Sequence, residues 1–292
     1  MNNQINKIIE TLLSANKFND RLPIIEQKML DSLLILLKDL EIGNDGRIKS
    51  NIKNLKLVNG IKNKLEKLIV NKEYLKDLKD YIRSFDAAAV YAGAYFKSIS
   101  NKFDSKKPYY AAITKTAIDA AVTSLTKDGI SYYVASPIQD KLMTAVTSGQ
   151  SYASLLGTLQ KDIVSSKDNT GSLSRFAGTY SITALSLFTG QYMAAINKDL
   201  GFKWFRYVGS NIKTTREFCL RMTEKEWVHE SEFEMILSGN IDGYQVRIND
   251  ATGLPLGMIA GTDTSNFPAN AGGWNCQHGM FPVPDFVNSN KP

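Results

Sequence analysis

Residues 181–210 read SITALSLFTGQYMAAINKDLGFKWFRYVGS, and they contain the point at which the chain changes its structural pattern. Apolar residues recur at helical spacing up to this point, which predicts a long helix over Leu173–Leu200. After Gly201 the run Lys203–Val208 is aromatic and β-branched, which favours a strand, and the turn-forming residues Gly209–Asn211 follow it. The pattern therefore predicts a helical body that gives way to a different, smaller fold near residue 200.

Helical patterns dominate the sequence before this point. Pro23 lies near the expected start of a second helix, Asn44–Gly46 form a break, and helical spacing resumes over Leu55–Phe85. Further helices are expected over Tyr109–Thr126, Ser136–Ser148, Ser151–Val164 and Leu173–Leu200. We therefore expect a mainly α fold, in which an elongated multi-helix N-terminal region is followed by a small α+β C-terminal module. The expected boundaries are 1–130 for a helical region without a motif, 131–200 for helices leading into the module, and 201–292 for the module.

The composition is that of an ordinary globular protein, with 43% hydrophobic and 22% charged residues. The N-terminal residues lack the pattern of a signal peptide, and no apolar run is long enough to cross a bilayer. We therefore expect a soluble protein that stays inside the producing cell, or inside a particle assembled there, without membrane contact. Two cysteines are too few for a disulfide scaffold. The net charge of +6 is compatible with a nucleic-acid neighbour. The lysines of the first hundred residues are dispersed among acids, however, which is typical of a solvated helix face.

The expected module holds all the cysteines and histidines of the chain, namely Cys219, His229, Cys276 and His278. Thr214 or Thr215 is a candidate cap for a short helix whose first turn carries Glu217, a favourable charge at a helix N-terminus. A second short helix is expected over Glu230–Ser238. The segment 250–271 is rich in Gly, Pro and Asn, which predicts a loop, and residues 272–284 predict a tight turn into a final strand.

Zinc is the metal that this residue set favours, because thiolate and imidazole are its usual structural ligands. The candidate ligands are Cys219, Cys276 and His278, with His229 or a non-histidine group as the fourth. The spacing leaves plainer alternatives open: the two cysteines pack together as small apolar residues, or they approach closely enough to form a disulfide after cell lysis. In these alternatives His278 hydrogen-bonds the turn that carries Arg216, and His229 lies at the surface.

Two further roles concern single residues of the module. Cys219 or Cys276 is a candidate nucleophile with His278 as its base, although the sequence offers no residue to orient the histidine. Arg216 is expected to bind a carboxylate inside the module, and the alternative is a phosphate of a nucleic acid.

Three pieces of the module match, in order, a known family. An aromatic strand precedes a Thr-Arg-x-x-Cys turn, a variable insert contains Gly253-Leu254-Pro255, and a Gly-Gly-aromatic-Asn-Cys-x-His element ends in Pro-Val. The residues that carry this pattern are Trp204, Thr215, Arg216, Cys219, Gly273, Trp274, Asn275, Cys276 and His278. Over residues 135–286 the chain resembles the Mu F-like head morphogenesis family of phage minor head proteins. It differs in having Gln277 where Arg is frequent and a single cysteine at the first site.

The resemblance implies a structural minor capsid protein of a tailed phage, without catalytic residues and without a certain cofactor. Such a protein is made in the host cytoplasm and resides in the virion, at the capsid interior or the portal vertex. Its implied partners are the portal protein and the major capsid protein during procapsid formation, with nonspecific contact to packaged DNA. Two other hypotheses remain open: a Cys–His enzyme or effector built on the module, and a non-viral helical adaptor.

Overall fold

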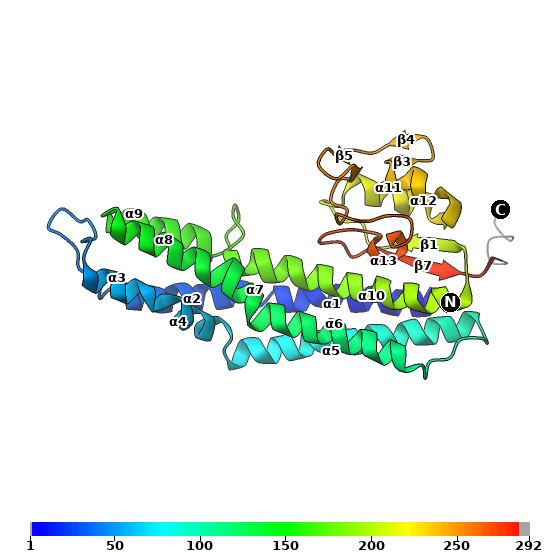
Figure 1. Cartoon of the computed structure of the whole chain (residues 1–292), viewed down its shortest axis with the longest axis horizontal. Helices are drawn as coiled ribbons and strands as arrows, with labels where there is room; N and C mark the ends of the chain where they lie inside the picture. The colour runs from blue at the N-terminus through cyan, green and yellow to red at the C-terminus, as the bar shows by residue number, and fades with distance from the viewer. Residues whose placement is uncertain (1, 286–292) are drawn as a thin grey trace. The chain divides into compact units, whose positions relative to one another are not determined.

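The structure, a computed structural model, describes residues 2–285 and is mainly α, with 64% of the chain in helices. Figure 1 shows the order of its elements along the chain. The α-helices of the first two hundred residues are α1 (Asn2–Asn19), α2 (Leu22–Leu37), α3 (Ile52–Asn59), α4 (Ile61–Ile69), α5 (Lys72–Ile99), α6 (Pro108–Thr126), α7 (Asp128–Ile130), α8 (Ser136–Thr147), α9 (Tyr152–Ile163) and α10 (Thr179–Leu200). Two π-helical turns, η1 (Ser131–Ala135) and η2 (Ser174–Gly178), precede α8 and α10. The expected fold class is confirmed.

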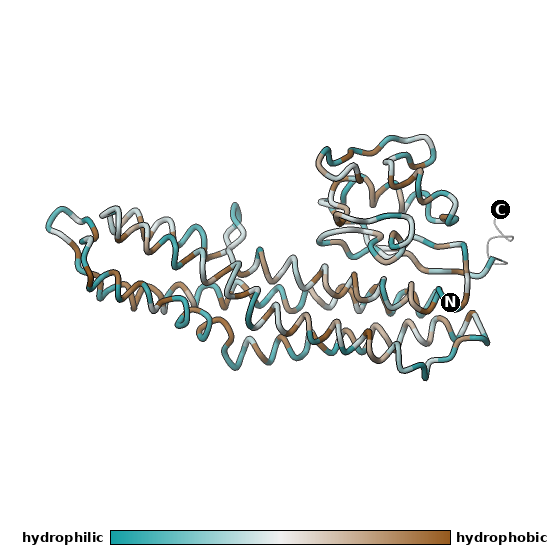
Figure 2. Tube along the Cα trace, viewed as in Figure 1, coloured by the Kyte–Doolittle hydropathy of each residue, from teal (hydrophilic) through white to brown (hydrophobic). Residues whose placement is uncertain are grey.

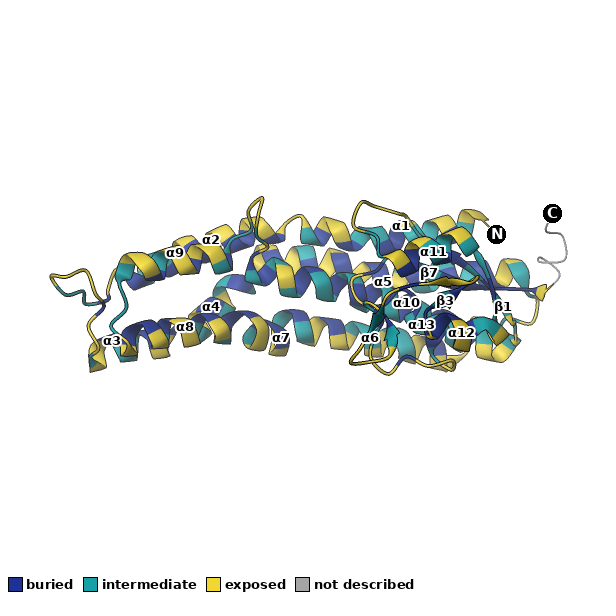
Figure 3. Ribbon diagram, turned by 90° about the horizontal axis from the view of Figure 1, so that it is seen from above, coloured by how far each residue is buried: buried dark blue, intermediate teal, exposed yellow. Residues whose placement is uncertain are grey.

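The helices have the amphipathic character that their sequences predict. Apolar and polar residues alternate along them (Figure 2), and buried positions recur on one side of α2 and α8 (Figure 3). Pro23 lies in the first turn of α2, where its missing N–H has no helical partner to lose. The helices expected around residues 109–126, 136–148 and 151–164 are present as α6, α8 and α9.

The segment expected to be helical over Leu55–Phe85 is divided among three helices. Gly60 is the C-cap residue of α3, and Val70 is that of α4, where the backbone leaves the helical region with ψ of 54°. Asn71 then begins α5, because its Oδ1 accepts the backbone N–H groups of Glu73 and Tyr74 at 2.9 and 3.0 Å. A side chain that caps a new helix here replaces the hydrogen bonds that a continuous helix would make.

After α10 the fold changes to α+β, as expected. The elements of this C-terminal module (residues 201–285) are β1 (Trp204–Val208), α11 (Glu217–Lys225), β2 (Trp227–His229), η3 (Glu230–Glu232), α12 (Phe233–Leu237), β3 (Asn240–Ile241), β4 (Tyr244–Gln245), β5 (Ile248–Asn249), β6 (Leu254–Pro255), α13 (Phe267–Asn270) and β7 (Gly279–Val283). The predicted strand at 203–208 and the final strand are therefore confirmed. The expected loop 250–271 contains β6 and α13.

The main sheet of the module has the antiparallel order β2-β1-β7. Phe205 and Tyr207 alternate with less buried residues along β1 and face a core that includes Phe218 and Met222 of α11. Pro282 lies in β7, at the edge of the sheet, where a residue without an N–H is tolerated. The module therefore has a hydrophobic core of its own.

The chain forms two compact units that are discontinuous in sequence. Unit 1 comprises Met1–Ala15, Arg83–Ile118 and Ile182–Pro292, and unit 2 comprises Asn16–Ile82 and Asp119–Ser181. The C-terminal module therefore belongs to a unit that also contains segments of α1, α5, α6 and α10.

A group of aromatic residues packs within the largely aliphatic core of unit 2. The ring of Phe18 stacks on Tyr81 at 5.4 Å and meets the edge of Tyr74 at 5.7 Å. The two tyrosine hydroxyls donate to the backbone carbonyls of Ser181 and Leu125, both at 2.8 Å. A buried carboxylate, Glu26, accepts the N–H groups of Ser165 and Ser174, which lie at the two ends of the loop after α9.

In unit 1 the helical segments contact the module through defined hydrogen bonds. Tyr95 of α5 donates to the carbonyl of Pro282 at 2.6 Å, and the Asn275 N–H donates to Thr183 Oγ1 of α10 at 2.9 Å. Gln277 donates to the carbonyl of Leu12 at 3.3 Å. These contacts place the loop before β7 against α10 and α1.

Within residues 2–285, no helix combines the length and the apolar character that crossing a bilayer requires.

Candidate functional site

The sheet register brings the two halves of the predicted motif together. In the antiparallel pair β1–β7, Val208 lies opposite Gly279. The residue after β1, Gly209, therefore lies beside the residue before β7, His278. Helix α11 begins after the turn that follows Gly209, and Cys219 lies in its first turn. Cys276 and His278 approach from the other side, on the turn that leads into β7.

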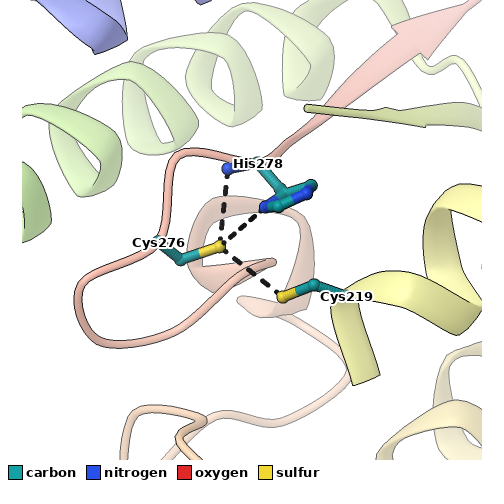
Figure 4. A group of neighbouring side chains, drawn as sticks. All are labelled: Cys219, Cys276 and His278. Atoms are coloured by element: carbon teal, nitrogen blue, oxygen red, sulfur yellow. Dashed lines mark hydrogen bonds between the residues drawn. The ribbon is translucent and has the colours of Figure 1, made fainter. Parts of the chain in front are cut away.

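Cys219, Cys276 and His278 form one buried cluster (Figure 4). The two sulfur atoms are 3.7 Å apart, and Cys276 Sγ is 3.3 Å from His278 Nδ1. The three candidate ligand atoms all lie within 4.8 Å of one another. Both cysteines are free thiols. The predicted convergence of these residues is thus present in the structure.

Hydrogen bonds fix the orientation of the His278 ring. Its Nε2 lies 3.2 Å from Asn211 Oδ1, and Asn211 Nδ2 donates to Thr223 Oγ1 of α11, also at 3.2 Å. An amide oxygen only accepts, so Nε2 carries a proton, and Nδ1 faces Cys276 Sγ. The ring of Tyr207 stacks on the imidazole at 5.6 Å with an interplanar angle of 18°.

Two glycines make room for the cluster. A Cβ on Gly272 would lie 2.0 Å from Cys276 Sγ, and a Cβ on Gly209 would lie 2.3 Å from the Cδ2 atom of His278. Neither position accepts a side chain unless the cysteine or the histidine moves. The turn also requires Asn275 to adopt a φ of 52°, a conformation that Asn tolerates better than most residues.

The cluster changes the acidity of its members in opposite directions. A hydrogen bond from the Cys276 thiol lowers the pKa of Cys219 to about 4, against the opposing effect of burial. The same pairing, together with burial, raises the pKa of Cys276. Burial and the neighbouring Cys219 and Cys276 raise the pKa of Tyr207. One of the two coupled thiols therefore loses its proton well before the other.

Arg216 contacts backbone carbonyls and not the carboxylate that was expected. Its Nη1 donates to the carbonyl of Gly257 at 2.7 Å, and its Nη2 donates to that of Gly272. Arg216 can approach this carbonyl closely because Gly257, with a φ of +86°, lacks the Cβ that would overlap the guanidinium. The positive guanidinium is then stabilised by the carbonyl oxygens that it binds. Arg216 thus joins the start of α11 to the insert and to the turn before the cysteine.

The threonines before α11 do not cap it. The N-cap residue of α11 is Arg216, and no side chain caps this helix. Thr215 instead closes its own turn, since its Oγ1 accepts the N–H of Ile212 at 2.7 Å. The favourable position of Glu217 in the first turn is confirmed, and its carboxylate also accepts the Tyr244 hydroxyl at 2.6 Å.

His229 lies outside the cluster, so it is not the fourth member of the expected ligand set. It caps η3, with Nδ1 accepting the N–H of Ser231 at 3.3 Å, and its ring lies 4.9 Å from that of Trp204. The pairing of β2 with β1 accounts for this position, because it sets His229 opposite Trp204, at the far end of the strand from Gly209.

The remaining motif residues shape the turn before Cys276. Gly273 has a φ of +76°, and a Cβ there would lie 2.1 Å from the carbonyl of Gly257. Trp274 is half exposed, and its backbone N–H donates to the same Gly257 carbonyl at 2.9 Å. The sequence interpretation missed Tyr207 and Asn211 as members of the site. The alternation of β1 is a signal for the burial of Tyr207, whereas nothing local marks Asn211.

A cavity of about 20 Å³ borders the cluster on the α10 side. Its lining includes Gly190, Gly272, Cys276 and His278. A volume of this size holds about one water molecule. The chemistry open to the cluster is therefore that of two thiols and one imidazole in a closed space: packing, disulfide formation, or binding of a single metal ion.

Comparison with protein-family models, with curated proteins and with solved structures finds no match to this chain. An assignment of function therefore rests on the residues and on their arrangement.

Proposed function

We propose that this protein is a structural minor head protein of a tailed phage that assembles with the portal protein or the inner capsid surface during procapsid formation. The proposal combines the motif order in the sequence with the geometry of the module. Its function is binding: the protein presents its helices and its module to the partner proteins of the shell.

One observation carries the proposal, namely that the separate pieces of the motif meet. The Thr-Arg-x-x-Cys turn and the Gly-Gly-Trp-Asn-Cys-x-His element are more than fifty residues apart. They nevertheless meet through the Cys219 and Cys276 thiols and through the Arg216 guanidinium, which donates to the backbone carbonyl of Gly272. A motif whose residues bind one another stabilises a fold, and such a motif is expected of an assembly module.

The small cavity beside the cluster supports a structural role over catalysis. Cys276 and His278 line a space of about 20 Å³, whereas pockets for small-molecule ligands measure about 300–1,000 Å³. An enzyme at this position would need α10 or the loop before β7 to move before a substrate reached the sulfur atoms. The hydrogen bond from Ser186 to the carbonyl of Cys276, at 2.5 Å, opposes that movement.

The contact with packaged DNA is proposed for one segment of unit 2, which departs from the general mixing of lysines with acids over the first hundred residues. Residues 47–72 contain eight Lys and Arg residues and one acidic residue, a net charge of +7, while the whole chain carries +6. Lys56 and Lys64, on α3 and α4, are among the exposed lysines of this segment. Clustered exposed lysines bind phosphates without reading sequence, and they release counterions as they do so.

Quantitative mass spectrometry of purified virions and procapsids tests the main proposal. We expect a few to a few dozen copies per particle that resist washing with high salt. Absence from both kinds of particle would remove the head-protein assignment, and the adaptor and enzyme hypotheses would then be assayed in its place.

The DNA contact has a separate test in the double variant Lys56→Glu/Lys64→Glu. We expect weaker binding to duplex DNA and a salt dependence whose slope is smaller by about 2, since two phosphate contacts are lost. Lys102→Glu/Lys106→Glu is the matched control, because it makes the same charge change at exposed positions of the loop between α5 and α6. Equal effects of the two pairs would show that only net charge matters, and would remove residues 47–72 as the contact.

A further inference from the structure

We infer that Cys219, Cys276 and His278 bind one zinc ion, with the Tyr207 hydroxyl facing the fourth coordination position. The inference rests on the geometry of the cluster and does not depend on the head-protein proposal.

The distances in the cluster fit the edges of a zinc tetrahedron. Zinc–sulfur bonds of about 2.3 Å and zinc–nitrogen bonds of about 2.0 Å give a sulfur–sulfur edge of about 3.8 Å and a sulfur–nitrogen edge of about 3.5 Å. Two edges have corresponding distances, 3.7 Å between the two sulfur atoms and 3.3 Å from Cys276 Sγ to His278 Nδ1. The third edge, from Cys219 Sγ to the His278 ring, is at most 4.8 Å, so zinc binding would draw these two side chains closer together. The three side chains thus point toward one small volume (Figure 4).

An unsatisfied hydroxyl group supplies an independent sign of a missing ligand. Tyr207 is 1% exposed, and within residues 2–285 its hydroxyl has no hydrogen-bond partner. The Tyr207 ring stacks on the imidazole of His278 with the ring centroids 5.6 Å apart. A buried hydroxyl without a partner costs about 1–3 kcal/mol, so such groups are rare unless an ion or a water completes them. The Tyr207 hydroxyl meets this description.

The surroundings of His278 are those of a metal ligand. Histidine ligands usually donate their second ring nitrogen to an oxygen atom, which fixes the tautomer that binds the metal. Here Nε2 donates to Asn211, whose amide is held by Thr223 of the same helix that carries Cys219. The backbone N–H of His278 also points to Cys276 Sγ at 3.4 Å, a contact that favours a thiolate.

Donor type and charge select zinc among the common ions. Two thiolates and one imidazole form a soft donor set, which disfavours magnesium and calcium. Two thiolate charges would balance the charge of the ion, so the buried site would be neutral. Since all three ligands are buried, a bound ion would exchange slowly and act as a structural centre that joins α11 to the turn before β7.

The test uses the full chain without an affinity tag. Its zinc content is measured by plasma mass spectrometry, as purified and after metal removal and refilling. We expect one zinc per chain in both states. Replacement by Co²⁺ should give the thiolate charge-transfer band and the strong visible bands of a tetrahedral site. A folded chain that takes up no zinc after refilling, while both thiols react with a thiol reagent, would overturn the inference.

Variants separate a built site from adventitious binding. Cys219→Ser, Cys276→Ser and His278→Ala should each lower the zinc affinity at least tenfold. His229→Ala is the matched control and should keep one zinc, because His229 lies outside the cluster. Zinc content that falls equally in the control, or that persists in the three ligand variants, would contradict the assignment.

Tyr207→Phe tests the fourth position without removing a cysteine or the histidine. We expect the variant to keep its zinc with lower affinity and to shift the visible Co²⁺ bands, because the oxygen at the fourth position is lost. An unchanged Co²⁺ spectrum would remove Tyr207 from the site. Circular dichroism of each variant shows whether it is folded, and refilling of the wild-type chain tests the inference even if a variant fails to fold.

Discussion

Unit 2 and the C-terminal module (residues 201–285) reach their buried state through different kinds of contact. In unit 2, apolar side chains recur along the buried faces of the helices. Completely buried examples are Leu65 on α4, Leu142 on α8 and Leu159 on α9. In the module, the helices and strands are short, and a few polar residues join segments that are distant in sequence. We therefore predict that losing one polar contact, such as those of Arg216, costs the module more free energy of unfolding than losing one polar contact costs unit 2.

The chain offers a convenient way to measure this contrast. Its three tryptophans, Trp204, Trp227 and Trp274, all lie in the module. Tryptophan fluorescence therefore reports on the module, while far-ultraviolet circular dichroism reports chiefly on the helices. Urea unfolding followed by both signals compares the two regions in one experiment.

The largest effect is expected for Arg216→Met. The substitution removes two charged donors from the carbonyls of Gly257 and Gly272, so the module should lose about 3 kcal/mol in its free energy of unfolding. Arg21→Met is the control, because the ion pair of Arg21 with Asp77 is exposed and should contribute less than about 0.5 kcal/mol. Equal losses in the free energy of unfolding for Arg216→Met and Arg21→Met would contradict the proposed difference between the module and unit 2.

Gly272→Ala is expected to cost the module about 2 kcal/mol, because its Cβ would overlap Cys276 Sγ. The same change at Gly157, inside α9, meets no atom within 4 Å. Gly157→Ala should therefore stabilise unit 2 by up to about 1 kcal/mol, as alanine does in a helix interior. Unfolding midpoints that move in the same direction for both variants would contradict this prediction.

A smaller effect is expected for Tyr81→Phe in unit 2. The substitution removes one buried hydrogen bond, from the Tyr81 hydroxyl to the Ser181 carbonyl, and keeps the ring that stacks on Phe18. The loss should be about 1 kcal/mol by circular dichroism. A loss of more than about 3 kcal/mol would mean that unit 2 also depends on single polar contacts.

The smallest effect concerns pH and Glu217. A hydrogen bond from Tyr244 lowers the pKa of Glu217 below its usual 4.5. A carboxyl whose pKa is lower in the folded state stabilises the fold above its unfolded pKa, and this contribution is lost as the pH falls through the folded value. Glu217→Gln should therefore lower the fluorescence midpoint slightly at neutral pH, and the difference should shrink toward acid pH. A difference that grows on acidification would have the wrong sign.

Sequence reasoning was most successful where a local pattern decides the structure. The period of the apolar residues predicts α6, α8 and α9, and the aromatic run after Gly201 predicts β1. The division of the segment 55–85 was missed, although Asn71 carries a readable capping signal. Within the site, the meeting of Cys219, Cys276 and His278 was predicted as a hypothesis. Only the sheet register excludes His229, and only tertiary contacts bring in Asn211, so neither was visible in the sequence.

Cys219 and Cys276 are 57 residues apart in the sequence, yet their sulfur atoms are 3.7 Å apart. The insert between them therefore begins and ends at the cluster. For a flexible loop, the entropic cost of bringing the two ends together grows only with the logarithm of the loop length. Doubling such a loop costs about 0.6 kcal/mol. Changes of length are therefore expected to be tolerated in the exposed turn 250–253 between β5 and β6. The rest of the insert is held in place, because β2 pairs with β1 and Gly257 accepts a hydrogen bond from Arg216.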